Sequence, residues 1–295
     1  MTDSPLRVRS FAKINLALSV LGRRTDGYHD IQTIFQAISL SDEIEFRASP
    51  QLDLVCEALA GVPKEQNLVW KAAVGLASAF SVHRGASITL KKVIPAGAGL
   101  GGGSSNAAAT LLALRRFWEL DIPESALFSI AETLGSDVPF FLTGGMALGF
   151  GRGEKIRPLP DAPARHLAVL FPGVQVSTAE AYRALSLGLT SSREDHRIQR
   201  FIGQVESGES FLTGIFNDFE ASVLAAHPSI EEAMSFLERQ GATAVMLSGS
   251  GSSVFGFFSD EESAFAVSRG VLRETWRVFP AKTLSRAEYF PKMFG

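Results

Sequence analysis

The sequence has little cysteine and no large excess of charge, and both shortages exclude classes of protein. Cys56 is the only cysteine among 295 residues, so no disulfide can form within the chain, and a reducing compartment fits. The 28 basic and 31 acidic residues give a formal net charge of -3, which provides no basic field for nucleic acid or an anionic membrane. We therefore expect local features of the fold to bind any anionic ligand.

Long apolar runs and metal-ligand spacings are also missing. No apolar stretch approaches the ~20 residues of a membrane span, and residues 1–10 contain no apolar segment of signal-peptide length. The five histidines show no spacing typical of a metal site. The sequence predicts a soluble, cytoplasmic protein without a structural metal, a membrane partner or a nucleic-acid partner.

Strand and helix patterns alternate irregularly along the chain. Periodicity and capping residues predict helices over 67–80, 104–118, 123–135 and 230–240. Apolar runs and alternation predict strands over 6–21, 43–48, 52–58, 86–94, 166–171, 242–247 and 253–258. The hairpin-like spacing of these strands disfavours a purely parallel sheet, so we expect an α+β fold of mixed sheets packed with helices.

A proline cluster divides the predicted elements into two parts. It reads RPLPDAP over residues 157–163 and predicts a boundary between domains at 1–160 and 161–295. The segment 187–210 is polar and contains several glycines, which indicates an exposed connection. Whether this connection acts as a mobile lid is left open by the sequence.

The most informative local feature is the run IPAGAGLGGGSSNAAA, residues 94–109. It joins a predicted strand to a predicted helix and contains glycine at 97, 99, 101, 102 and 103. Glycines let backbone N–H groups approach a ligand closely, and the helix that opens at Ser104 and Ser105 adds unpaired donors and a partial positive charge. This combination favours a phosphate-binding loop.

Three other interpretations of the run fit less well. A Walker A loop requires lysine where Gly103 stands. The dinucleotide fingerprint is matched by Gly97, Gly99 and Gly102, but it also needs a strand that ends in an acidic residue, whereas Asp121 is followed by a helix start. An unstructured surface loop is disfavoured because strand, glycines, serines and helix follow in a working order.

Three motifs together resemble the superfamily of galactokinase, homoserine kinase, mevalonate kinase and phosphomevalonate kinase. They are PAGAGLGGGSSNAA at 95–108, LSGSGSSVFGFF at 247–258 and AKINLAL at 12–18. The resemblance implies a two-domain kinase with its active site in the cleft between domains, ATP as co-substrate and Mg²⁺ as cofactor. It implies that ATP is bound by Pro95, Gly97, Gly99, Leu100, Gly101, Gly102, Gly103, Ser104, Ser105, Asn106, Ser248, Gly249 and Gly251.

Two stretches bring the resemblance closer to one family, the 4-diphosphocytidyl-2-C-methyl-D-erythritol kinases of the non-mevalonate isoprenoid pathway. They are AKINLALSVLGRRTDGYHDIQTIFQ at 12–36 and LGSDVPFFL at 134–142. The resemblance implies phosphorylation of the substrate's 2-hydroxyl, with Asp137 as catalytic acid/base and Lys13 as its cationic neighbour. Gly102 and Gly103 replace a serine pair that several relatives carry, so the Mg²⁺ ligands stay unknown.

The residues themselves are compatible with these roles but leave alternatives open. Lys13 and Asn15 share one face of an apolar strand, and a buried lysine requires a partner. Lys13 on an edge strand would instead reach solvent, and Asp137 would then cap a turn or helix before Pro139.

The family resemblance also assigns substrate-binding residues. It implies that Asn15, Tyr28, His29 and Tyr182 bind the cytidine-linked substrate, although Tyr28 and His29 taken alone are typical of a loop. We expect a monomer or weak homodimer.

Three further residues and two competing functions remain open. Asn217 and Asp218 favour a helix cap, although the pair could support the active site. Arg152 favours a hairpin turn, although it could contact phosphate. The competing functions are another small-molecule kinase of the superfamily, for mevalonate, homoserine or a sugar, and a non-catalytic ligand sensor on the same scaffold.

Overall fold

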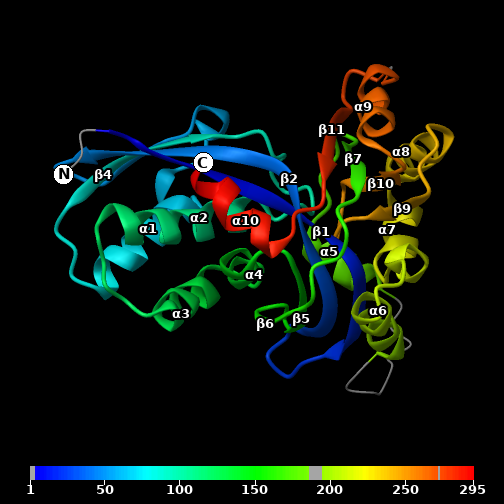
Figure 1. The fold of residues 1–295 in the computed structure, drawn as a ribbon, viewed down its shortest axis with the longest axis horizontal. Helices are drawn as coiled ribbons and strands as arrows, with labels where there is room; N and C mark the ends of the chain where they lie inside the picture. The colour runs from blue at the N-terminus through cyan, green and yellow to red at the C-terminus, as the bar shows by residue number, and fades with distance from the viewer. Residues whose placement is uncertain (1–3, 186–194, 272) are drawn as a thin grey trace.

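The computed structural model describes residues 4–185, 195–271 and 273–295, and it contains two sheets with helices packed against them (Figure 1). The strands are β1 Leu6–Arg23, β2 His29–Ser49, β3 Asp53–Val55, β4 Gly85–Lys91, β5 Met146–Gly151, β6 Lys155–Pro158, β7 His166–Phe171, β8 Phe216–Asn217, β9 Ala244–Leu247, β10 Val254–Phe258 and β11 Arg277–Lys282. The α-helices are α1 Leu68–Ala79, α2 Gly102–Phe117, α3 Glu124–Leu134, α4 Val138–Thr143, α5 Thr178–Ala184, α6 His196–Glu206, α7 Glu220–Ala226, α8 Pro228–Arg239, α9 Glu261–Arg269 and α10 Arg286–Phe294.

The larger sheet is built on the long antiparallel pair of β1 and β2. Its strand order is β3-β4-β2-β1-β8, with β5 also paired to β2 and β6 to β5. Every residue of β1 from Ser10 to Val20 is buried, because layers cover both faces of this central strand. A polar side chain in that stretch is therefore removed from solvent and needs an internal partner.

Helices α1 to α4 cover one face of the larger sheet, and the C-terminal helix α10 joins them (Figure 1). The fully buried Tyr289 of α10 packs in the same apolar cluster as Phe11 and Phe141. The last residues of the chain thus complete the core of the first half. The division at residue 160 stays a prediction.

The smaller sheet is antiparallel, in the order β11-β7-β10-β9, and helices α8 and α9 pack against it. It supplies the predicted strand–loop–strand arrangement around Gly249, because β9 and β10 pair from Leu247↔Val254 onward. Mixed strand directions and packed helices confirm the predicted α+β class.

Each predicted helix and strand has a counterpart in the structure, and the differences in extent have physical causes. Ten described α-helices and strands were not predicted, namely α4, α5, α6, α7, α9, α10, β5, β6, β8 and β11. Helix α2 begins at Gly102, two residues before the predicted start, with Gly101 as its N-cap. Strand β2 extends from His29 to Ser49, far beyond the predicted 43–48, because it pairs with β1 along its length. In the predicted strand 52–58 only β3 is extended, and a 3₁₀ turn, Glu57–Leu59, follows.

An exposed connection was expected over residues 187–210, and this expectation is wrong for residues 196–206. Residues 196–206 form the amphipathic helix α6, whose apolar side chains recur every three or four residues and are buried. These are Ile198, Phe201, Ile202 and Val205. Residues 187–194 of that prediction lie outside the described residues.

Candidate active site

The glycine-rich loop holds a backbone conformation that favours glycine at three positions. Gly97, Gly99 and Gly101 have φ of +66°, +76° and +66°. A Cβ at Gly101 would lie 2.8 Å from the ring of Phe141 and 3.0 Å from the Lys13 side chain. The loop therefore presents bare backbone beside Lys13, directly before the N-terminus of α2.

The second glycine loop, between β9 and β10, packs against the first. Ser253 N–H donates to Ala98 O at 3.1 Å, and Ser248 Oγ donates to Gly99 O at 2.9 Å. A Cβ at Gly99 would lie 2.1 Å from Ser248 O. The structure thus brings together two motifs about 150 residues apart, as the family resemblance implied.

Lys13 is buried between the two loops, with only 4% of its side chain exposed. Its Nζ donates to Asn15 Oδ1 at 2.6 Å and to Gly99 O at 2.9 Å, and it lies 3.6 Å from Asp137 Oδ2. Burial lowers the pKa of Lys13, while the charge of Asp137 opposes that shift. The alternative of an edge-strand lysine that reaches solvent is wrong, because Lys13 is buried.

Asp137 precedes helix α4, and its carboxylate lines the cleft. It occupies the N-cap position, yet its side chain makes no capping hydrogen bond. About a third of the side chain, 33%, is exposed. The carboxylate is therefore accessible to a substrate in the cleft while one oxygen faces Lys13. Asp137 thus lies in the turn before α4, where the alternative placed it, but its side chain does not cap the helix.

An aromatic cluster lies in the same cleft. The rings of His29 and Tyr182 stack, with centroids 4.4 Å apart and planes 10° apart. The rings of Tyr182 and Phe219 pack edge to face, with centroids 4.8 Å apart and planes 86° apart. Burial raises the pKa of Tyr182 to about 12 and lowers the pKa of His29, so burial favours the neutral form of both rings. We call His29, Tyr182 and Phe219 the aromatic platform.

Tyr28 and Arg152 lie on the rim of this cleft. Tyr28 is exposed over 57% of its surface. The guanidinium of Arg152 lies 5.0 Å from the centroid of the Tyr28 ring. Arg152 follows β5 at the turn into β6, which confirms the hairpin-turn interpretation. Its side chain nevertheless faces the cleft and adds a positive charge there.

The cleft has a volume of about 1080 Å³ and contains all of the predicted catalytic and substrate-binding residues. It is also lined by Gly97, Gly99, Gly101, Ser104, Gly249 and Gly251. The remaining predicted ATP-binding residues do not line it. These are Pro95, Leu100, Gly102, Gly103, Ser105, Asn106 and Ser248.

Asn106 belongs to a buried polar cluster under the loop. Its Nδ2 donates to Asp42 and Ser10, and its Oδ1 accepts from Lys92. Asp42, fully buried, also pairs with Lys92 and accepts from the backbone N–H of residues 93 and 94. Asp42 thus anchors the entry of the glycine loop. No local feature of the sequence links Asp42 to a loop about 50 residues away, so this role was not predictable.

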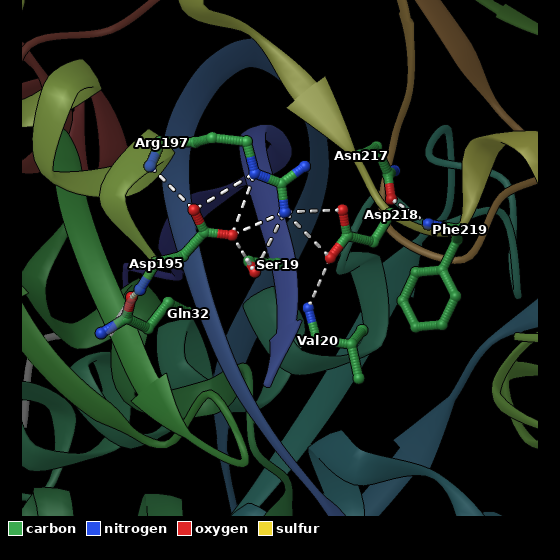
Figure 2. A network of polar contacts seen from close by, with 8 residues as sticks. All are labelled: Ser19, Val20, Gln32, Asp195, Arg197, Asn217, Asp218 and Phe219. Carbon is green, nitrogen blue, oxygen red and sulfur yellow. Dashed lines mark hydrogen bonds and ion pairs between the residues drawn. The ribbon is translucent and has the colours of Figure 1, made fainter. Parts of the chain in front are cut away.

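Asn217 and Asp218 also have roles that the sequence did not reveal (Figure 2). Helix α7 begins at Glu220 with Phe219 as N-cap, so the helix-cap interpretation is wrong. Asn217 Nδ2 donates to Leu247 O and Gly249 O, at 2.9 and 2.8 Å. Asp218 accepts from Val20 N–H and pairs with Arg197.

Two features are absent from the described residues, a metal-binding cluster and a membrane-spanning helix. In the described ranges, no three His, Cys, Asp or Glu side chains gather as a metal site would require. No helix in the part of the chain that the structure describes has the length and apolarity to cross a bilayer.

Comparisons with known proteins agree with this geometry. Residues 67–145 match the family described as GHMP kinases N terminal domain, and residues 203–278 match GHMP kinases C terminal. A 4-diphosphocytidyl-2-C-methyl-D-erythritol kinase from Syntrophus aciditrophicus (strain SB) is 41% identical, covering 95% of this chain and 99% of the relative. One from Solibacter usitatus (strain Ellin6076) is 45% identical, covering 90% and 84%.

A solved structure gives the same result. A crystal structure of 4-(cytidine 5'-diphospho)-2C-methyl-D-erythritol kinase has a TM-score of 0.79 and 33% identity, covering 94% of this chain and 99% of that one. The paired glycine loops, the Lys13–Asp137 pair and these similarities lead to one assignment. This chain belongs to the 4-diphosphocytidyl-2-C-methyl-D-erythritol kinase family of the GHMP kinases.

Proposed function

We propose that this protein transfers the γ-phosphate of ATP to the 2-hydroxyl of 4-diphosphocytidyl-2-C-methyl-D-erythritol. The observation that carries the proposal is the 3.6 Å approach of Lys13 to Asp137 in a cleft that also holds the glycine loop and the aromatic platform. A phosphate site, a carboxylate and a base-sized aromatic surface are the three parts that this reaction needs.

The carboxylate of Asp137 accepts the proton of the substrate hydroxyl as its oxygen attacks the γ-phosphorus. The ammonium of Lys13 orients that carboxylate and stabilises the negative charge that develops on the transferred group. Lys13 is well suited to this role, because its bonds to Asn15 and Gly99 hold it in one position. Positioning and electrostatics supply most of the rate gain in phosphoryl transfer.

The glycine loop and the N-terminus of α2 hold the phosphates of ATP. Gly97, Gly99 and Gly101 line the cleft without side chains, so backbone N–H groups are accessible to phosphate oxygens. Ser248 and Gly249 support this loop from the opposite side. Residues such as Asn106 act indirectly, through the shape of the loop.

The cleft also fits Mg²⁺ bound together with ATP. Mg²⁺ prefers oxygen ligands and is commonly held by one or two protein groups plus substrate phosphates. Ser104 is an oxygen-bearing side chain on the cleft wall in the first turn of α2, so it is the group beside the phosphates that would hold the ion. When bound, the ion neutralises charge on the phosphates.

The aromatic platform and Tyr28 distinguish the substrate from other alcohols. A cytosine ring offers a flat face for Tyr28 and a hydrogen-bonding edge for His29. Homoserine, mevalonate and sugars lack such a ring, so a kinase for those alcohols has no use for this part of the cleft. We further expect a cytoplasmic protein that is a monomer or weak homodimer.

One experiment tests the function directly. Purified protein is incubated with ATP, Mg²⁺ and single alcohols, namely the cytidyl substrate, mevalonate, homoserine and galactose, and ADP release is followed. We expect turnover with the cytidyl substrate alone. Turnover with a different alcohol would reassign the enzyme within the superfamily, and ligand binding without turnover of any alcohol would favour a sensor.

A further inference from the structure

A short segment, residues 216–219, lies between the phosphate side and the substrate side of the cleft. Strand β8 pairs in parallel with β1, at Ala17↔Phe216 and Leu18↔Asn217, a few residues beyond Lys13. Asp218 N–H continues the pairing with Leu18 O at 3.0 Å. Asn217 and Asp218 contact different parts of the protein, since the amide of Asn217 bonds to the second glycine loop and the carboxylate of Asp218 pairs with Arg197.

The amide of Asn217 fixes the second glycine loop. Its Nδ2 donates to the carbonyls of Leu247 and Gly249, and only 8% of the residue is exposed. Gly249 in turn packs against the catalytic lysine, since a Cβ there would lie 3.4 Å from Lys13 Nζ and 3.3 Å from Asn15 Oδ1. The position of Asn217 therefore affects the wall around Lys13.

The same amide also fixes the aromatic platform. Asn217 Oδ1 accepts from the backbone N–H of Phe219 at 3.0 Å. The ring of Phe219 lines the cleft and meets Tyr182, which stacks on His29. Both donors and the acceptor of this one side chain are thus used, on two sides of the cleft.

The opposite side of the segment is held by ion pairs (Figure 2). Asp218 lies 3.0 Å from Arg197 Nη2 and accepts from Val20 N–H at 2.9 Å. Arg197 also pairs with Asp195, at 2.6 Å, and stacks 4.0 Å from the ring of Phe216. These contacts hold the backbone at 216–218 in place, so the amide of Asn217 projects from a fixed support.

We infer that Asn217 is a positioning residue that sets both the Gly249 loop beside Lys13 and the aromatic platform. The inference rests on the proposed function, because it assigns the loop to ATP and the platform to the cytidyl substrate. Loss of this amide should weaken the binding of both ATP and the cytidyl substrate. Loss of a group that contacts only the loop or only the platform should weaken the binding of one of them.

The test measures two dissociation constants by calorimetry, one for a non-hydrolysable ATP analogue with Mg²⁺ and one for the cytidyl substrate. Asn217→Asp keeps the acceptor for Phe219 but replaces the donor with an oxygen that faces two carbonyls. Ser248→Ala changes the phosphate side alone, and Phe219→Leu the platform alone. Leu237→Ala, fully buried in the smaller sheet's core, is the control for general loss of stability.

We expect Asn217→Asp to raise both dissociation constants about tenfold, as the loss of buried hydrogen bonds implies. Ser248→Ala should raise only the dissociation constant of the ATP analogue, and Phe219→Leu only that of the cytidyl substrate. Leu237→Ala should raise neither constant. If Asn217→Asp does not fold, as judged by circular dichroism, Asn217→Ser, which retains one donor, is measured instead. A change in only one constant, or in neither, would overturn the inference.

Failure of the proposed function has a different signature. In that case the unmodified protein would bind no cytidyl substrate, and the inference would fail with it. Tight binding of both ligands by the unmodified protein, with Asn217→Asp indistinguishable from it, would overturn the positioning role alone.

Discussion

Lys13 Nζ lies 3.6 Å from Asp137 Oδ2, and the two residues differ sharply in exposure, with 4% and 33% of their side chains open to solvent. The ammonium is therefore fixed in the protein interior, while the carboxylate reaches the cleft. This asymmetry suits a pair in which the aspartate meets the substrate and the lysine orients it.

Replacing the carboxylate tests its role as base. Asp137→Asn keeps the shape of the side chain but cannot accept a proton, so we expect kcat to fall by a factor of about 10² to 10⁴. Binding of an ATP analogue should change by less than about twofold, which calorimetry would measure. A variant that retains near-normal turnover would rule out Asp137 as the base.

Replacing the ammonium tests the second member of the pair. Lys13→Met leaves Asn15 Oδ1 and Gly99 O without their donor, and we expect kcat to fall at least about 100-fold. Lys13→Arg should not restore activity, because a planar guanidinium cannot reproduce the bonds that the compact ammonium makes to Asn15 Oδ1 and Gly99 O. Lys71→Met, at an exposed position of α1, is the matched control and should behave normally.

The histidine of the aromatic platform should affect one substrate only. His29→Ala removes the ring that stacks on Tyr182, and we expect KM for the cytidyl substrate to rise about tenfold while KM for ATP stays unchanged. His83→Ala removes an exposed histidine elsewhere and serves as control. Equal increases in both KM values would argue against a role in binding cytidine.

Two glycines of the loop should respond oppositely to alanine. At Gly99, φ is +76° and a Cβ would lie 2.1 Å from Ser248 O, so Gly99→Ala should lower the free energy of unfolding by at least about 1–2 kcal/mol. Gly103 lies inside α2, and a Cβ there would lie 3.5 Å from the Leu68 side chain, an ordinary contact. Gly103→Ala should therefore raise the free energy of unfolding by up to about 1 kcal/mol. Denaturant unfolding measures both, and equal destabilisation would contradict this view.

The ion pair of Asp195 with Arg197 should make the stability of the fold depend on pH. Burial opposes its ionisation, but hydrogen bonds from Arg197 and Ser19 lower the pKa of Asp195 from 3.8 to about 2. A lowered carboxyl pKa stabilises the fold above pH 4, and this contribution is lost as pH falls toward 2. After allowance for solvent screening around the half-exposed Arg197, it amounts to about 1 kcal/mol.

The variant Asp195→Asn isolates that contribution. Asparagine retains an acceptor for the helix N-terminus but carries no charge. We expect its free energy of unfolding to be about 1 kcal/mol below that of the unmodified protein at pH 6, and the difference to vanish near pH 2. A difference that is independent of pH would show that the charge of Asp195 contributes nothing.

Elements with strong local signals were predictable from the sequence. Asn67 caps α1, and Pro123 and Gly135 flank α3, because capping and chain termination depend on neighbouring residues. The length of β2 was not predictable in this way, since its first half is held by pairing with β1. Helix α6 was missed although its apolar spacing is helical, because its surroundings are polar.

The sequence by itself determined the chemistry available to this protein: glycines where the backbone turns to positive φ, and one lysine in an apolar strand. Backbone sterics and burial costs act within a few residues, so such features can be read locally. Only the tertiary structure decided which groups meet, such as Lys13 with Asp137 and Asn217 with Gly249. A hydrogen bond or ion pair is effective over only a few ångströms, and the packing of distant segments sets distances on that scale.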